Sequence, residues 1–214
     1  MSRWIWIALI GLSAALWWKG QRHAAPMAAS ALSDGASIEC VPPRPFTDPD
    51  QPLQSPLDDR MPAFRLGAAK VTPLAGFSLQ ARVLSREDYS LGAEAEYSPT
   101  DLALGWGPMT DPDITDKLDI SQGGRWYHYR WGESGPPIPL RQIIGHSANM
   151  HMVPADGLVA RSLEKVRDGD TVRIDGWLIR IDRDDGWRWQ SSLTREDSGG
   201  GACELVYVCS IEKQ

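Results

Sequence analysis

The sequence lacks an excess of basic residues, internal repeats and an even number of cysteines. The formal net charge of -6 gives no global positive field that would attract nucleic acid. With 42% hydrophobic and 23% charged residues, the chain is close to globular averages, which excludes disorder throughout. The length of 214 residues suits one domain of ordinary size with additional segments. Three cysteines would leave at least one thiol over in an exported protein.

Residues 4–18, WIWIALIGLSAALWW, form a long apolar run without a charge. The run is close in length to a signal-peptide core and shorter than the roughly 20 residues of a typical spanning helix. Tryptophans at both ends and the flanking Arg3 and Lys19 favour a helix that stays in the bilayer. We therefore predict an inner-membrane anchor over residues 1–23. The alternatives are a buried core helix and a signal peptide that is cleaved near residues 29–31.

The orientation of this anchor is poorly determined by charge. Arg3 lies on one side of the apolar run, and Lys19 and Arg22 lie on the other. Because short N-terminal anchors commonly export the domain on their C-terminal side, we predict a single-pass protein whose globular domain is periplasmic.

A Pro/Ala-rich linker is predicted over residues 24–62. Seven of the sixteen prolines lie between Ala24 and Met61, and the segment has little apolar periodicity. Such a composition favours an extended, semi-rigid spacer between the membrane and the body.

Residues 63–214 are predicted to form a β-rich domain. FSLQARV at 77–83 alternates apolar and polar residues, which is typical of a half-buried strand. Residues 70–74 would be its hairpin partner, with the turn at Ala75–Gly76. Further strands are predicted at DLALGWG, RWYHYRW, WRWQSS and ELVYVCSI. Asp111 and Asp156 are placed to cap two short helices.

The segment DGDTVRIDGWLIRID predicts a long strand with a change of phase. Val172 and Ile174 have one parity, whereas Trp177 and Ile179 have the other. A β-bulge at Asp175–Gly176 would keep both sets inside and bend the strand, as happens in small barrels. The predicted fold class is α+β and β-rich, a small, partly open barrel of the OB or SH3-like kind.

Cys203 and Cys209 are predicted to share one strand, which places them roughly 20 Å apart and beyond disulfide reach. A bridge would need Cys40 or a second chain. The sequence favours Cys209 as a small buried apolar residue.

The stretch IIGHSANMHMVPADG, residues 143–157, holds His146 and His151 five positions apart. Neither a helix nor a strand puts residues with this separation on one face. A turn at 147–149 could bring them together, and His128 and Asp156 could then complete a metal site. We favour a tight turn in which Ser147 and Asn149 bond to their own backbone, and we predict no metal or cofactor.

Five strings resemble a family of uncharacterised proteobacterial proteins with one N-terminal membrane segment. They are SPTDLALGWGPM, SQGGRWYHYRW, HSANMHMVPAD, GDTVRIDGWL and DGWRWQSSLTREDSGGGACELVYV, and they span roughly residues 66–211. The resemblance implies a membrane-tethered or envelope context and carries no activity or site residue.

Together these observations predict a membrane-tethered binding domain of the bacterial envelope, held in the inner membrane through residues 4–18. The expected partner is an envelope protein or a glycan, and nucleic acid is disfavoured by the acidic charge. The predicted binding residues are His146, Ser147, Asn149, His151, Trp187 and Arg195.

Two alternatives stay open. One is an envelope hydrolase that uses His146, His151 and Cys203, with or without zinc. The other is a single-strand nucleic-acid binder, which would require a cytoplasmic domain and would use the arginines and aromatic residues of RWYHYRW and WRWQSSLTR.

Overall fold

The computed structural model describes residues 39–43, 50–194 and 203–214. The predicted anchor and cleavage region therefore lie outside the described residues, as does Arg195. Within the described ranges, no helix combines the length and the apolar character that crossing a membrane requires.

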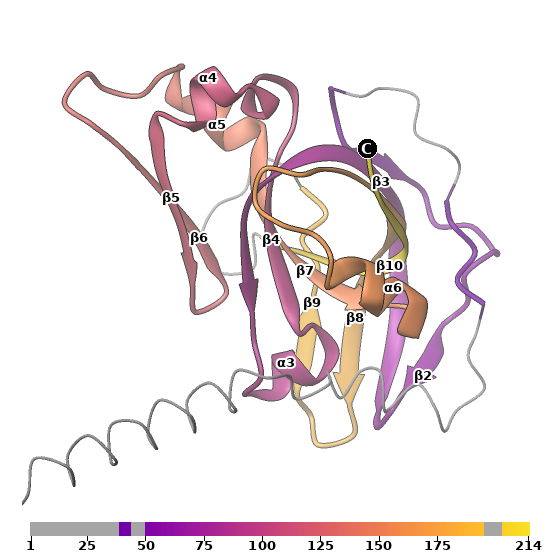
Figure 1. The fold of residues 1–214 in the computed structure, drawn as a ribbon. Helices are drawn as coiled ribbons and strands as arrows, with labels where there is room; N and C mark the ends of the chain where they lie inside the picture. Colours follow the sequence, from indigo (N-terminus) through magenta and orange to yellow (C-terminus); the bar gives the residue numbers. More distant parts are fainter. Residues whose placement is uncertain (1–38, 44–49, 195–202) are drawn as a thin grey trace, which may run out of the picture.

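The main sheet is partly ring-like, which confirms the prediction of a β-rich fold (Figure 1). Around the ring the strands follow the order β3 (Ala69–Asp88), β4 (Thr100–Gly105), β7 (Ser147–Pro154), β10 (Glu204–Lys213) and β8 (Thr171–Arg183), and β8 pairs again with β3. The β7–β10 pair is parallel, and the other pairs of the ring are antiparallel.

β3 is one long bent strand, so the predicted hairpin with a turn at Ala75–Gly76 is wrong. Its first part pairs with β8 and its last part with β4, with register shifts after Pro73 and Val83. Position 76 requires a glycine for a reason other than a turn. A Cβ atom there would lie 2.3 Å from Ser55 Oγ, because β1 (Leu53–Ser55) crosses closely at this position.

Alternate residues of the ring strands fill its interior. The core contains Phe77, Leu79, Leu102, Leu104, Met150, Met152, Ile174, Leu178, Val206 and Val208, all fully buried. Helix α6 (Gly157–Leu163) connects β7 to β8 and adds Val159 and Leu163 to this core. Asp156 caps α6 as predicted, because its Oδ1 accepts hydrogen bonds from the backbone N–H groups of Leu158 and Val159.

β8 serves two cores with its two parities, and the predicted bulge at Asp175–Gly176 is wrong. Trp177 and Ile179 face a second core outside the ring. The register shift lies instead on β10, between Val208 and Ser210. A Cβ atom on Gly176 would lie 2.2 Å from the carbonyl oxygen of Tyr207, so only glycine fits against β10 here.

The N-terminal part of the described chain completes this second core. β1 and β2 (Phe64–Leu66) pair with β3, and Met61 is buried, although the proline content predicts a spacer in this region. Cys40 forms a disulfide with Cys209 across a sequence separation of 169, with a Cα–Cα distance of 5.2 Å. The expectation that Cys209 is an unpaired apolar residue is therefore wrong.

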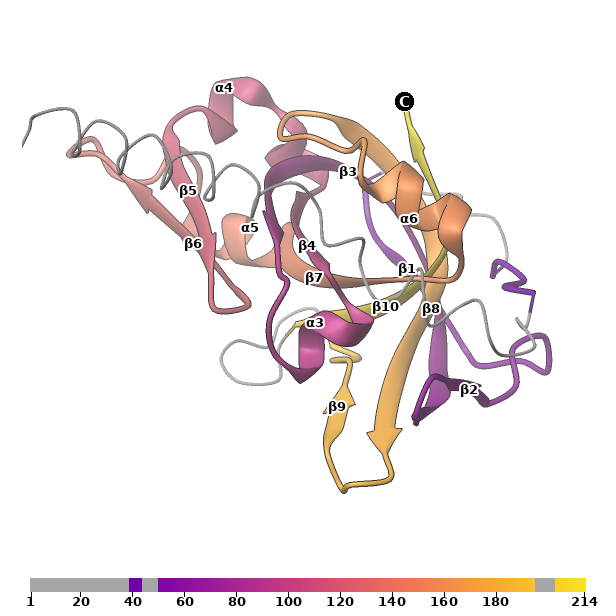
Figure 2. The ribbon, with the colours of Figure 1, turned by 60° about the horizontal axis from the view of Figure 1, so that its bottom comes forward.

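A long insertion between β4 and β7 projects from the ring (Figures 1 and 2). It contains η1 (Gly107–Thr110), α4 (Pro112–Thr115), β5 (Leu118–Gly123), β6 (Trp126–Trp131) and α5 (Leu140–Gly145). β5 and β6 form a separate two-stranded hairpin. Asp111 caps α4 as predicted. Two more short elements, α3 (Ala93–Tyr97) and β9 (Arg188–Gln190), lie in the β3–β4 and β8–β10 connections.

Candidate functional site

The tip of the β5–β6 hairpin is a two-residue turn made by Gly124 and Arg125. Both have positive φ angles, 58° and 72°. Two-residue hairpin loops of this kind favour glycine or asparagine, and a left-handed conformation costs other residues roughly 1–2 kcal/mol. An arginine in this place therefore points to a role for its side chain.

Arg125 fixes the hairpin tip to the outer face of β4 and β7. Its Nη1 lies 2.6 Å from Oδ1 of Asp101, a carboxylate with no exposed surface. Its backbone N–H donates to the Tyr89 hydroxyl at 3.0 Å, and its guanidinium carbon lies 3.8 Å from the Tyr89 ring centroid. The ring of Trp189 lies 5.6 Å away from the same carbon. The guanidinium thus has a carboxylate partner and two aromatic neighbours.

Asp101 also contacts two side chains of β7. It stands opposite His151 in the β4–β7 register, and its Oδ1 lies 2.9 Å from His151 Nδ1. The two atoms are in close contact, although Nδ1 makes no hydrogen bond within the described residues. Asn149 Nδ2 donates to Asp101 Oδ2 at 3.2 Å and to the Arg125 carbonyl at 3.0 Å.

Hydrogen bonding within this cluster is incomplete. Gln122 donates to Asn149 Oδ1 at 2.6 Å, yet its own Oε1 has no partner among the described residues. The same holds for Arg125 Nη2, and His151 Nδ1 lacks a hydrogen bond of good geometry within those residues. Buried polar side chains nearly always have partners, so three such atoms in one place require a functional or structural explanation.

Cys203 lies next to this cluster, directly before β10. Its Sγ is 3.9 Å from the carbonyl oxygen of Arg125. In the parallel β7–β10 pair, Leu205 stands beside His151. Cys203 itself lies in a bend, and its contact with the Arg125 carbonyl places its thiol on the outer side, next to the hairpin tip. Its thiol is half-buried and takes no part in the disulfide.

Aromatic side chains border the cluster on the β8–β9 side. The Trp189 ring centroid lies 4.7 Å from that of His151 and 6.1 Å from that of Trp187. Trp187 in turn stacks on Tyr97 at 5.8 Å. Trp126, the residue after Arg125, is 42% exposed. We call the whole assembly the hairpin-tip site, composed of Tyr89, Asp101, Gln122, Arg125, Asn149, His151, Trp189 and Cys203.

The structure brings together only some of the residues singled out from the sequence. Asn149, His151 and Cys203 meet in the hairpin-tip site, and Trp187 lies at its margin. His146 is elsewhere: it ends α5, its Nδ1 lies 2.8 Å from the Gln142 carbonyl, and its ring packs near Gly107.

The predicted turn at 147–149 is wrong, because these residues open strand β7. Ser147 does bond to backbone, since its Oγ donates to the Ile143 carbonyl at 2.7 Å. Asn149 bonds across strands instead. Within the described ranges, no group of three or more histidine, cysteine or acidic residues is arranged to hold a metal ion.

Sequence reasoning missed Asp101, Arg125, Tyr89 and Trp189 as members of one site. The sequence did hold a signal for Asp101, because this lone carboxylate precedes the apolar run LALG. The six-residue strand that contains it, β4, is buried throughout. The Gly-Gly-Arg order at 123–125 was a second signal, since it puts a charged residue in a tight turn.

Burial keeps two tyrosines of this region in the neutral form. Burial raises the pKa of Tyr89, whose hydroxyl accepts the Arg125 N–H. Burial raises the pKa of Tyr127, on β6, to about 12. Both phenols therefore stay protonated at neutral pH and add no charge to the site.

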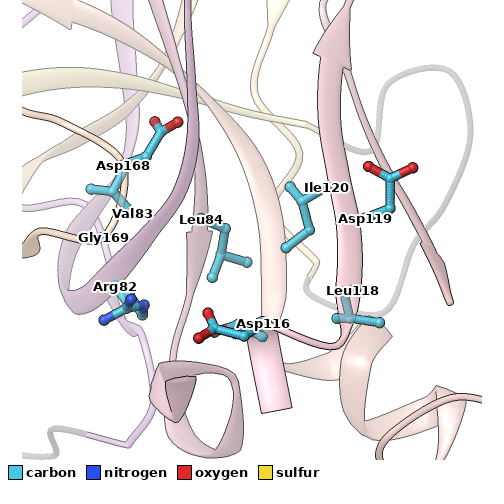
Figure 3. A pocket seen from close by; sticks show the side chains of 10 residues that line it. Arg82, Val83, Leu84, Asp116, Leu118, Asp119, Ile120, Asp168 and Gly169 are labelled. Atoms are coloured by element: carbon cyan, nitrogen blue, oxygen red, sulfur yellow. The ribbon is translucent and has the colours of Figure 1, made fainter. Parts of the chain in front are cut away.

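A separate hollow of about 480 Å³ lies between β3, β5 and the turn before β8 (Figure 3). Leu84 and Ile120 lie on its two walls, and Arg82, Asp116 and Asp168 surround them. None of the residues of the hairpin-tip site lines it. The hollow is therefore separate from the hairpin-tip site.

Comparison with known proteins gives no relative for the chain: no family model, no curated protein and no solved structure matches it. Arguments about function therefore depend on the geometry of the described residues.

Proposed function

We propose that the chain is a membrane-tethered binding module of the bacterial envelope, and that the hairpin-tip site binds a glycan. In this proposal residues 4–18 hold the protein in the inner membrane and the globular domain faces the periplasm. The disulfide between Cys40 and Cys209 supports this location, because disulfides form and persist in oxidising compartments such as the periplasm.

The ring has the features of an OB-type barrel, and this is part of the proposal. Five strands close the ring, the third and fifth strands (β7 and β10) are parallel, and α6 connects the third strand to the fourth. In barrels of this type, ligands bind on the face of the second and third strands, between the first and the last connecting loops.

The position of the hairpin-tip site on this face is the observation that carries the proposal. Asp101 is on the second strand, β4, and His151 is on the third strand, β7. Tyr89 follows the first strand, and Trp189 belongs to the connection between the fourth and fifth strands. The cluster of buried polar groups thus coincides with the part of the fold that is suited to ligands.

The chemistry of the site favours a sugar over a nucleic acid. The half-buried rings of Tyr89, Trp187 and Trp189 each contact another ring or a guanidinium. In this proposal a sugar ring packs against the parts of these rings that stay exposed. Planar side chains that donate and accept hydrogen bonds, Gln122 and Asn149, lie beside them. The single arginine here is already paired with Asp101, and the net charge is -6, so a phosphate backbone has little attraction.

The test is co-sedimentation of the full-length protein, in a non-ionic detergent, with purified peptidoglycan sacculi. The wild-type protein should sediment with the sacculi. Trp189→Ala should weaken this binding about tenfold or more, as loss of a stacking aromatic does elsewhere. Trp131→Ala is the matched control, because Trp131 lies at the opposite end of the hairpin from Arg125 and is exposed.

Equal binding by both tryptophan variants, or no sedimentation of the wild type, would contradict the proposal. If Trp189→Ala lowers the melting temperature, Tyr89→Leu repeats the test from the opposite side of Arg125. A single-stranded DNA oligonucleotide is the competing probe. Tight binding of this probe with a steep dependence on salt would favour a nucleic-acid binder instead.

A further inference from the structure

We infer that Asp101, His151 and Cys203 form a catalytic set in which the Cys203 thiol attacks a small acyl group. This inference goes beyond binding, and it does not depend on the ligand being a glycan. It arises from the order in which three neighbouring strands present three complementary side chains.

The three side chains are arranged as acid, base and nucleophile. β4 carries Asp101, β7 in the middle carries His151, and Cys203 directly precedes β10 on the other side of β7. Asp101 and His151 alternate with core residues and project outward, and the Cys203 thiol contacts the hairpin tip, which lies on the same outer side. The strand that carries the histidine therefore lies between those that present the carboxylate and the thiol, the order that suits an activating base. The β7–β10 register, continued one step beyond Glu204, places Cys203 beside Asn149, two residues before His151.

Asp101 sets the orientation of the imidazole. Its Oδ1 lies 2.9 Å from Nδ1 of His151, so the other ring nitrogen, Nε2, points away from the carboxylate. The carboxylate is itself fixed by Arg125 at 2.6 Å and by Asn149 at 3.2 Å. In this inference a small rotation of the imidazole completes the Nδ1–Asp101 hydrogen bond when the acyl group binds, and Nε2 then serves as the base.

Arg125, at the hairpin tip, contacts both the Cys203 thiol and the polar side chains around Asp101. The Arg125 carbonyl lies 3.9 Å from Cys203 Sγ and accepts a hydrogen bond from Asn149. The Nη2 atom of the same residue is a buried donor that no described residue uses. In this inference it donates to the negative oxygen that forms when an acyl carbon is attacked.

The reaction balances without an oxidant or a metal. His151 Nε2 takes the thiol proton while sulfur bonds to the acyl carbon of an ester. The carbon–oxygen bond to the leaving alcohol then breaks, and His151 returns the proton to that alcohol. Water attacks the resulting thioester, again with His151 as base, which releases a carboxylic acid and restores the thiol. Because His151 and Asn149 are almost fully buried, the acyl group must be small.

The experiment uses the full-length protein in detergent with p-nitrophenyl acetate as the probe. Intact-protein mass spectrometry should show one acetyl group, located on Cys203 after digestion, and Cys203→Ala should lose it. His151→Gln should slow acetylation about 100-fold or more, the size expected for loss of a general base. His128→Gln is the matched control, because His128 is an exposed histidine on the hairpin, and it should leave the rate unchanged.

A second readout uses the wild-type protein alone, so it does not depend on whether a variant folds. The rate of alkylation of Cys203 by iodoacetamide in the wild-type protein should follow a pH midpoint well below that of an ordinary thiol. A merely structural cysteine would react slowly and with the ordinary midpoint. Acetylation at other residues only, or equal rates for His151→Gln and His128→Gln, would overturn the inference. Sedimentation with sacculi is measured separately, so that failure of catalysis and failure of glycan binding are distinguishable.

Discussion

Asp101 and His151 stand directly opposite each other on neighbouring antiparallel strands, with 2.9 Å between carboxylate Oδ1 and imidazole Nδ1. Neither side chain has appreciable exposure, and both lie outside the core that fills the ring of strands. Burial of a carboxylate is unfavourable unless other groups replace its water. The hairpin tip supplies that replacement, so the projecting insertion and the ring of strands stabilise each other.

Asp101→Ala should lower the free energy of unfolding by roughly 3–5 kcal/mol. The substitution leaves the Arg125 guanidinium largely buried without its carboxylate, and breaking a buried pair costs this much. Urea denaturation of the full-length protein measures the change. Asp119→Ala, at an exposed position of β5, is the control and should stay within about 0.5 kcal/mol of wild type. Similar values for the two variants would mean that the pair adds nothing.

Gly176→Ala should destabilise the fold strongly, by more than about 3 kcal/mol, because a new Cβ would lie 2.2 Å from the Tyr207 carbonyl oxygen. The contact is with backbone, so no side chain can move aside. The measurement is the melting temperature of Gly176→Ala, compared with that of wild type and of a control variant. Gly123→Ala is the matched control, since nothing lies within 4 Å of its Cβ position. A melting temperature unchanged in Gly176→Ala would show that β8 and β10 can separate there.

Replacing both Cys40 and Cys209 by serine should lower the free energy of unfolding by roughly 2–5 kcal/mol, the range for a native disulfide. The melting temperature of the wild type should fall when a reductant is added, whereas the melting temperature of the double variant should not change. Cys203→Ser should keep the sensitivity of the wild type to reductant, because Cys203 lies outside the bond. A transition insensitive to reductant in the wild type would argue against the pairing.

The domain should lose stability between about pH 10 and pH 12. Burial raises the pKa of both Tyr127 and Tyr207 to about 12, against 10.0 for an ordinary tyrosine. A folded-state pKa above the unfolded value means that the stability is fully present below pH 10. It is lost as pH rises toward 12, because the unfolded chain releases the protons first.

The alkaline prediction is checked with urea denaturation at a series of pH values. Each tyrosine should contribute on the order of 2–3 kcal/mol across this window. Tyr127→Phe should make the alkaline loss smaller than in wild type by the contribution of this one tyrosine, while Tyr207 and the other buried tyrosines keep theirs. A loss of stability equally steep in Tyr127→Phe would assign it to other groups.

The sequence predicts the strands well wherever neighbours along the chain decide the structure. Alternation at 77–83, the caps at Asp111 and Asp156, and the aromatic strand at 126–131 are all present in the structure. The predicted turn at Gly76 was wrong because a glycine that makes room for Ser55 on a neighbouring strand cannot be told in sequence from a glycine in a turn.

Long-range contacts account for the remaining errors and for much of the site. The change of parity in β8 was explained by a bulge, whereas it reflects a second core whose other members, such as Met61 and Phe64, lie more than a hundred residues earlier. Asp101 and Arg125 are separated by 24 residues, and no local pattern joins them. Asn149, His151 and Cys203 could be named from the sequence, whereas the carboxylate and the guanidinium that organise them could not.

The disulfide between Cys40 and Cys209 also determines how mechanical force would pass through the protein. Tension on the chain ahead of Cys40 would run through the covalent bond straight into β10. β1 and β2, held by a few hydrogen bonds at the rim, lie inside the covalent loop and would carry none of that load. A domain pulled from this end would resist being unzipped strand by strand, because the first element to feel the force is already enclosed by β7 and β8.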